Sequence, residues 1–96
     1  MKYWTDINFS YNDMQSAAVE SAKDCMNLCL SIDKCMAISF DTLRRFSSNC
    51  MLKTGVSKIV LEANGWVSAI KCNYVVPAHL TLEPAEGRHS AKGMLS

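Results

Sequence analysis

The residues with the greatest chemical potential in this chain are its cysteines. The 96-residue sequence contains five of them, Cys25, Cys29, Cys35, Cys50 and Cys72. A thiol can form a disulfide, bind a metal ion or act as a nucleophile. A chain this short buries a thin core, so cross-links are expected to supply part of its stability. Such cysteine density is typical of small domains from an oxidising compartment, which indicates a secreted or extracellular location.

Metal binding and thiol catalysis both fit the cysteine pattern poorly. Structural zinc sites usually contain two close cysteine pairs, whereas Cys35 and Cys50 each stand alone. A nucleophilic cysteine needs a histidine base, and both histidines, His79 and His89, lie in a C-terminal tail where no rigid geometry is expected. Scattered carboxylates are interpreted as solvated groups. We therefore predict no metal site, no other cofactor, no catalytic residues and no enzymatic activity.

One helix is predicted to carry two of the cysteines. Ser21 can accept hydrogen bonds from the first free backbone N–H groups, and Asp24 completes a variant of the capping box, so the helix should run to about Leu30. Cys25 and Cys29 then share one helix face with Cβ atoms about 5 to 6 Å apart. A disulfide requires about 3.5 to 4.5 Å. Each of these cysteines should therefore bridge to a different point on the sheet.

Two connectivities remain among the first four cysteines. The short turn after the helix brings Cys35 back beside Cys29, which favours Cys29–Cys35 together with Cys25–Cys50. On the loop-entropy model the longer loop contributes roughly 3 to 4 kcal/mol and the shorter about 2 kcal/mol. Reduction should therefore unfold the domain. Cys72 is left over, either as an intermolecular bridge, as the remnant of a pair lost by truncation, or as a free thiol.

Three strands are expected in the cysteine-bearing core. Residues 35–40 alternate large and small side chains, and the small face could lie close beneath the helix. Residues 50–53 form a second strand, antiparallel to the first, and residues 66–72 form a third after the Asn64-Gly65 turn. Residues 3–9 could add another. The fold class is therefore α+β, with a single helix packed on a small antiparallel sheet.

The chain divides into a domain, residues 1–72, and a tail, residues 73–96. The tail holds both prolines and shows neither helical nor strand periodicity after Val76, so we interpret it as disordered or derived from an expression vector. No apolar run approaches the roughly 18 to 20 residues of a membrane span, and no signal peptide is visible. We expect no membrane insertion and interpret the chain as an ectodomain fragment.

The spacing of the cysteines resembles that of the PAN/Apple family. The resemblance is carried by three segments, Ser21-Ala-Lys-Asp-Cys-Met-Asn-Leu-Cys29, Cys35-Met-Ala-Ile-Ser-Phe-Asp41 and Asn49-Cys-Met-Leu-Lys53. It implies a helix cradled on a curved antiparallel sheet, with the helix cysteines bridged to the positions of Cys35 and Cys50. Apple-type members add a bridge between the domain ends. No cysteine stands at Tyr3 or Trp4, so the four-cysteine PAN core is the closer match.

The resemblance implies an extracellular, non-catalytic recognition module that mediates protein–protein interaction or adhesion. A second hypothesis is binding of an acidic or sulfated glycan through the basic residues Lys34, Arg44, Arg45, Lys53 and Lys58. An ordinary charged face is the simpler interpretation of these residues. A third hypothesis is an assembly domain that forms a disulfide-linked dimer through Cys72. The net charge of +1 gives no reason to expect a nucleic-acid partner.

Two further surface features bear on an extracellular role. Asn8-Phe9-Ser10 fits the N-glycosylation sequon, which predicts a glycan on Asn8. Aromatic residues could stack on a sugar ring if exposed, and the candidates for this role are Tyr11, Phe46 and Tyr74. Trp4 and Trp66 are expected in the core of the sheet instead.

Overall fold

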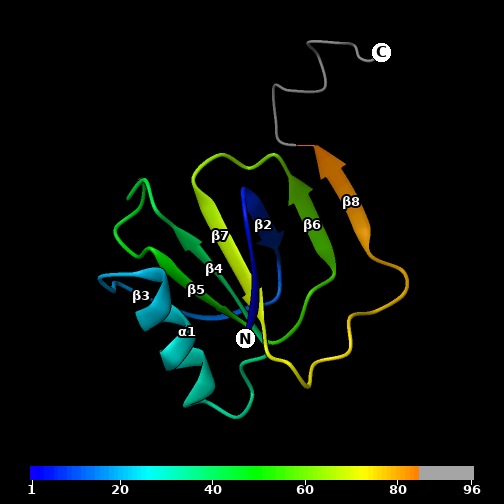
Figure 1. The fold of residues 1–96 in the computed structure, drawn as a ribbon, viewed down its shortest axis with the longest axis horizontal. Coiled ribbons are helices and arrows are strands. Elements are labelled where there is room, and N and C mark those ends of the chain that lie inside the picture. Colours follow the sequence, from blue (N-terminus) through cyan, green and yellow to red (C-terminus); the bar gives the residue numbers. More distant parts are fainter. Residues whose placement is uncertain (85–96) are drawn as a thin grey trace.

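The computed structural model describes residues 1–84, which form one helix and eight strands in two sheets (Figure 1). The elements are β1 (Lys2–Thr5), β2 (Ile7–Ser10), β3 (Asp13–Ala17), α1 (Ala22–Leu30), β4 (Ala37–Asp41), β5 (Cys50–Lys53), β6 (Lys58–Leu61), β7 (Trp66–Ile70) and β8 (Thr81–Pro84). An antiparallel five-stranded sheet has the order β1-β7-β4-β5-β3, and a three-stranded sheet has the order β2-β6-β8. The α+β class is confirmed, but the structure contains a second sheet in addition to the one that was expected.

The helix begins where the sequence predicts. Ser21 has extended backbone geometry, and its hydroxyl accepts a hydrogen bond from the Asp24 amide at 3.2 Å. This bond satisfies one of the amides that the first helical turn leaves free. The helix ends at Leu30, and Ser31 caps it with a 2.7 Å hydrogen bond from its hydroxyl to the Leu28 carbonyl.

Both predicted disulfides are present in the structure. Cys25–Cys50 joins the first half of α1 to the start of β5, with the Cα atoms 5.5 Å apart. Cys29–Cys35 joins the last turn of α1 to the segment before β4, with the Cα atoms 5.2 Å apart. All four of these cysteines are fully buried. Cys72 is a free, exposed thiol.

The two faces of β4 lie opposite to the expected arrangement. Ile38 and Phe40 pack with the four disulfide cysteines beneath α1, whereas Ala37 belongs to the core on the other side of the sheet. The prediction that the small face lies beneath the helix was therefore wrong. The physical reason is that large side chains fill the space under α1, while small residues are needed on the other face, where the backbone of β2 comes close.

A pair of buried serines holds β2 against the main sheet. Ser39 and Ser68 face each other across β4 and β7, with their oxygens 2.7 Å apart. The Phe9 amide donates to Ser39 Oγ at 2.9 Å, and Ser68 Oγ donates to the Ile7 carbonyl at 2.6 Å. Because the Ser68 proton is used on Ile7, Ser39 must donate to Ser68. On the edge of β2 that does not pair with β6, the Phe9 amide and the Ile7 carbonyl thus bond to two hydroxyls in place of a neighbouring strand.

Part of the tail belongs to the fold. Thr81–Pro84 forms β8, which pairs in parallel with β6, and Leu82 stands opposite Ile59. The expectation of no strand after Val76 is therefore wrong for these residues, because a short edge strand in a parallel pair shows too few residues for a periodic pattern. Residues 85–96 of the predicted tail lie outside the described residues. In Figure 1, α1 and β8 lie on opposite sides of the molecule.

The serine pair leads to a prediction about stability. Ser39→Ala leaves the buried Phe9 amide without its acceptor and interrupts the hydrogen-bond chain to Ile7. We expect a loss of about 1 to 3 kcal/mol in the free energy of unfolding, measured by urea denaturation. Ser31→Ala, at the exposed end of α1, is the control and should cost less. An unchanged stability of the Ser39 variant would show that β2 does not depend on this pair.

The disulfides lead to a prediction about thiol content. Alkylation of the folded, unreduced protein should label one thiol per chain, Cys72, and mass spectrometry after reduction should find five. The two bridges together contribute about 5 kcal/mol, which is comparable with the whole stability of a small domain. Reduction should therefore abolish the cooperative unfolding transition seen by circular dichroism. A protein that carries five free thiols and still unfolds cooperatively would contradict this assignment.

Candidate functional site

The loop between β4 and β5, residues 42–49, is exposed and is anchored by hydrogen bonds at both ends. We call it the β4–β5 loop. It contains two of the predicted binding residues, Arg44 and Arg45. It also exposes two large apolar side chains, since Leu43 is 52% and Phe46 is 55% exposed. Polar contacts at both ends hold the loop in one shape, so these apolar groups are presented to solvent by a rigid support.

Asp41, the last residue of β4, anchors the beginning of the loop. Its side chain is fully buried, and its carboxylate accepts from the Leu43 amide at 3.1 Å and from the Arg45 amide at 2.8 Å. The Arg45 guanidinium adds two hydrogen bonds, from Nε at 3.1 Å and from a terminal nitrogen at 2.8 Å. Burial raises the pKa of Asp41, but the hydrogen bonds from Arg45 and the two amides outweigh it, and the net pKa is lowered.

Trp66 supports the middle of the loop from the facing strand β7. The Arg45 guanidinium lies 5.5 Å from the centroid of the Trp66 ring, and the Phe46 ring lies 6.2 Å from it. The neighbouring Gly65 is required here for two reasons. Its φ is +86°, and a Cβ atom at this position would lie 2.5 Å from the Leu43 side chain. The Leu43 side chain therefore occupies the space that a side chain at position 65 would need.

Asn49 anchors the end of the loop. Its side-chain amide accepts from the Val19 N–H at 2.9 Å and donates to the Val19 carbonyl at 2.8 Å, while its own carbonyl accepts from the Asp41 amide at 2.8 Å. Arg44 completes the contact with this region through a 3.3 Å hydrogen bond to the Glu20 carbonyl. The loop is thus fixed to the main sheet and to the segment that leads into α1.

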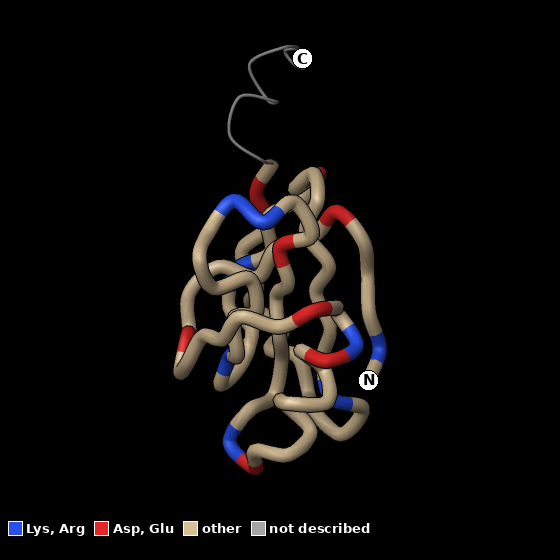
Figure 2. Tube along the Cα trace, turned by 90° about the vertical axis from the view of Figure 1, so that its left-hand side faces the viewer, with Lys and Arg blue, Asp and Glu red and all other residues tan. Residues whose placement is uncertain are grey.

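The five basic residues predicted to bind ligand do not share one surface. Lys34 precedes β4, whereas Arg44 and Arg45 follow the other end of that strand. Lys53 is buried and paired with Asp13. Lys58 is on the second sheet, where it forms a 2.7 Å ion pair with Glu83. Along the Cα trace in Figure 2, basic and acidic positions are interspersed, and three of the five basic residues pair with carboxylates of the protein.

The Glu83 carboxylate also affects the chemistry of Lys58. Its hydrogen bond with Lys58 raises the pKa of that ammonium group, and the Tyr11 ring lies 5.4 Å from the Lys58 nitrogen. Lys58 therefore stays protonated while it is bound to groups of the protein itself. An acidic glycan would have to compete with these contacts for Lys58, as it would with Asp13 for Lys53.

The predicted aromatic and glycosylation sites fall at different places. Tyr11 is 66% exposed, as the stacking hypothesis requires, whereas Tyr74 is half-buried and its hydroxyl accepts from the Val56 amide at 2.8 Å. Trp4 is 43% exposed and lies on the edge strand β1, so its expected place in the core is wrong. Asn8 lies in the middle of β2 and is partly buried; its glycosylation stays a prediction.

Sequence reasoning missed three contributors to the β4–β5 loop. Asp41 and Asn49 act as anchors, and Trp66 acts as a platform, although it was assigned to the core. The available signal was an Asp at the end of a strand with an Arg four residues later, which is typical of a local ion pair. Within residues 1–84, no group of three or more potential metal ligands lies together, and no helix has the length and apolar character of a membrane span.

Comparison with known proteins agrees with the family resemblance. Residues 7–53 match a family model described as PAN domain. The match runs from the start of β2 to the end of β5, so it includes α1, both disulfides and the whole β4–β5 loop. No curated protein matches the chain.

The Asp41 anchor leads to a prediction about pH. Asp41→Asn removes an ionised acceptor of four hydrogen bonds, and we expect a loss of about 2 kcal/mol in the free energy of unfolding near neutral pH. Because the pKa of Asp41 is lower in the folded state, its ionised carboxylate stabilises the fold fully at pH values above 3.8, the ordinary pKa of this group. The contribution is lost as the pH falls through the lower pKa of the folded state.

The stability difference between the wild type and Asp41→Asn should therefore be constant around neutral pH and should shrink below about pH 4. Urea denaturation at a series of pH values measures it. Asp33→Asn, which changes an exposed carboxylate after α1, is the matched control. If the stability difference between the wild type and Asp41→Asn stayed the same in strong acid, the ionised Asp41 carboxylate would not be the source of the stabilisation.

Proposed function

Because residues 7–53 are a PAN domain, we propose that this chain is an extracellular recognition module that binds a protein partner through the β4–β5 loop. PAN domains are generally protein- or carbohydrate-binding modules and are typically non-catalytic. The observation that carries the proposal is the exposure of Leu43 and Phe46 on a loop that hydrogen bonds anchor at both ends.

The composition of the loop supports a protein partner. Binding energy at protein interfaces is concentrated in a few aromatic and arginine side chains, and Phe46, Arg44 and the Trp66 platform supply such groups at one place. Because Asp41 and Asn49 already fix the backbone, little further conformational entropy is lost on binding. The complementary surface would offer an apolar pocket for Phe46 and a carboxylate within reach of Arg44.

The structure gives less support to the acidic glycan hypothesis. Such a ligand needs several free cations on one face, and three of the five candidates are engaged with carboxylates of the protein, namely Arg45, Lys53 and Lys58. Assembly through Cys72 stays a prediction, and the exposure of that thiol is compatible with it. The extracellular location is supported by the two buried disulfides within a PAN domain.

The test uses an array of recombinant extracellular proteins together with an array of acidic glycans. We expect saturable binding to a protein, weakened about tenfold or more by Phe46→Ala. Arg44→Asn should also weaken binding; asparagine suits this position because the φ of Arg44 is +53° and asparagine tolerates that region. Leu30→Ala, which removes a similarly exposed apolar side chain from α1, is the matched control and should leave the affinity unchanged.

Two results would contradict the proposed function. Protein binding that is equally strong in the wild type and in Phe46→Ala would place the interface elsewhere on the module. Binding to acidic glycans alone, with a steep dependence on salt concentration, would favour the glycan hypothesis in place of a protein partner.

A further inference from the structure

An apolar cavity lies between the two sheets, away from the β4–β5 loop. Its volume is about 310 Å³. The lining residues come from β1, β2, β6, β7, β8 and the connecting segments, and all of them are apolar: Trp4, Ile7, Phe9, Val56, Ile59, Leu61, Ile70, Val76 and Leu82. The cavity is open to solvent at one side, where Trp4, Leu61 and Leu82 are partly exposed.

The way β2 is attached explains why the cavity exists. The serine pair holds β2 tightly on the main sheet, while β6 and β8 continue the second sheet outward from β2. In this sheet, Phe9 pairs with Ile59, which in turn pairs with Leu82, and Ile7 pairs with Leu61 two residues along, so these side chains share the inner face. That face is covered near Phe9, which is buried, and left open near Leu82, which is 61% exposed.

The chemistry of the lining selects for an apolar ligand. Water in a cavity needs two or more polar partners, and none of these side chains offers an acceptor. An apolar cavity of about 150 Å³ is large enough to hold a benzene molecule, and the present volume has room for about ten methylene-sized groups. A short alkyl chain or a two-ring aromatic system would therefore fill it.

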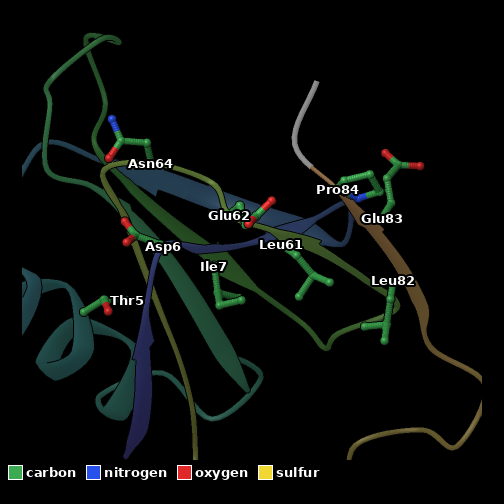
Figure 3. A pocket seen from close by; sticks show the side chains of 9 residues that line it. All are labelled: Thr5, Asp6, Ile7, Leu61, Glu62, Asn64, Leu82, Glu83 and Pro84. Carbon is green, nitrogen blue, oxygen red and sulfur yellow. The ribbon is translucent and has the colours of Figure 1, made fainter. Parts of the chain in front are cut away.

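The mouth of the cavity adds a preference for positive charge. A second, more open hollow shares Ile7, Leu61 and Leu82 with the cavity, so the two adjoin at these residues. In Figure 3 these three side chains point to one side of the sheet, whereas Glu62 and Glu83 of the second hollow point to the other. The acidic residues of the second hollow are Asp6, Glu62 and Glu83, and none of the described residues lining either hollow is Lys or Arg.

The three carboxylates do not contribute equally. Glu83 is paired with Lys58 at 2.7 Å, which offsets its charge, and Glu62 has contacts of its own. Asp6 is exposed, and one of its oxygens accepts from the Gly65 amide at 3.2 Å, which fixes the side chain beside the hollow. The preference for a cation is therefore argued from Asp6.

We propose that this cavity binds a small cationic amphiphile, with an apolar group of about ten carbons between the sheets and an amine beside Asp6. This site is separate from the β4–β5 loop and does not depend on the function proposed for it. Apolar burial supplies most of the affinity, and the carboxylate supplies the discrimination between amines and acids.

The first experiment tests the apolar part of the site. The probe is decylammonium, titrated below its micelle concentration into ¹⁵N-labelled protein and followed by NMR. We expect saturable shifts of amides in β2, β6 and β8. Leu82→Asn should weaken binding about tenfold, because it places a polar amide in the apolar lining without adding a charge. Leu30→Asn makes the same change at a leucine of α1 that is 53% exposed, and it should bind the probe as the wild type does.

The second experiment tests the charge preference. Decanoate has a chain of the same length with the opposite charge, and it should bind more weakly than decylammonium. Asp6→Asn keeps an oxygen for the Gly65 amide and a residue type that tolerates the φ of +59° at this position, so the fold should be preserved. We expect this variant to bind decylammonium about two- to fivefold more weakly and decanoate no more weakly than the wild type does.

Outcomes of three kinds would overturn the proposal. The first is the absence of saturable shifts around the cavity, or equal weakening in Leu82→Asn and Leu30→Asn. The second is equal affinity for decylammonium and decanoate in the wild type, or no effect of Asp6→Asn on either. The third is tighter binding of an apolar–basic tripeptide, acetyl-Leu-Trp-Lys-amide, than of decylammonium, which would assign the cavity to a protein partner.

Discussion

The attachment of one helix to the main sheet at two separate points is the constraint on which the rest of this structure depends. Cys25 and Cys29 lie one turn apart on α1, and their partners lie at the start of β5 and before β4. Because Cys50 directly follows the β4–β5 loop, the disulfide also fixes the point where the loop re-enters the sheet. A domain with so small a core could not hold an exposed apolar loop by packing alone. The Cys25–Cys50 disulfide therefore adds the support that fixes the end of this loop.

A second attachment, made without covalent bonds, produces the second sheet. Ser39 and Ser68 take the place of a neighbouring strand for β2 by bonding the Phe9 amide and the Ile7 carbonyl, while the other edge of β2 pairs with β6. The sheet that grows from β2 has only partial support on its inner face, because Phe9 is buried and Leu82 is not. The tight contact at β2 and the open cavity beyond it are thus two results of one arrangement.

Local chemistry determined which features could be predicted from the sequence. The Ser21 cap, the helix cysteines and the pairing of Cys29 with Cys35 depend on short spacings and fixed covalent geometry, and each of them was predicted, with Cys25–Cys50 as the remaining pair. The second sheet depends on side chains that meet over large separations, such as Phe9 with Ser39, which no local pattern reveals. The basic residues were grouped by their nearness in sequence, but β4 separates Lys34 from Arg44, and Asp13, far along the chain, pairs with Lys53. Trp66 alternates like a core residue yet supports an exposed loop.

The ladder between β4 and β7 positions both surfaces that we assign to binding. Its register places Asp41 opposite Trp66 at the loop end, Ser39 opposite Ser68 in the middle, and Ala37 opposite Ile70, which lines the cavity. Each of these three pairs therefore serves a different feature: the loop, the attachment of β2 and the cavity. Because side chains alternate between the two faces of a strand, Ala37, Ser39 and Asp41 all lie on the same face of β4, and all three are buried. A slip of one residue in this register would disturb all three features together, which makes the ladder the element that relates the loop to the cavity.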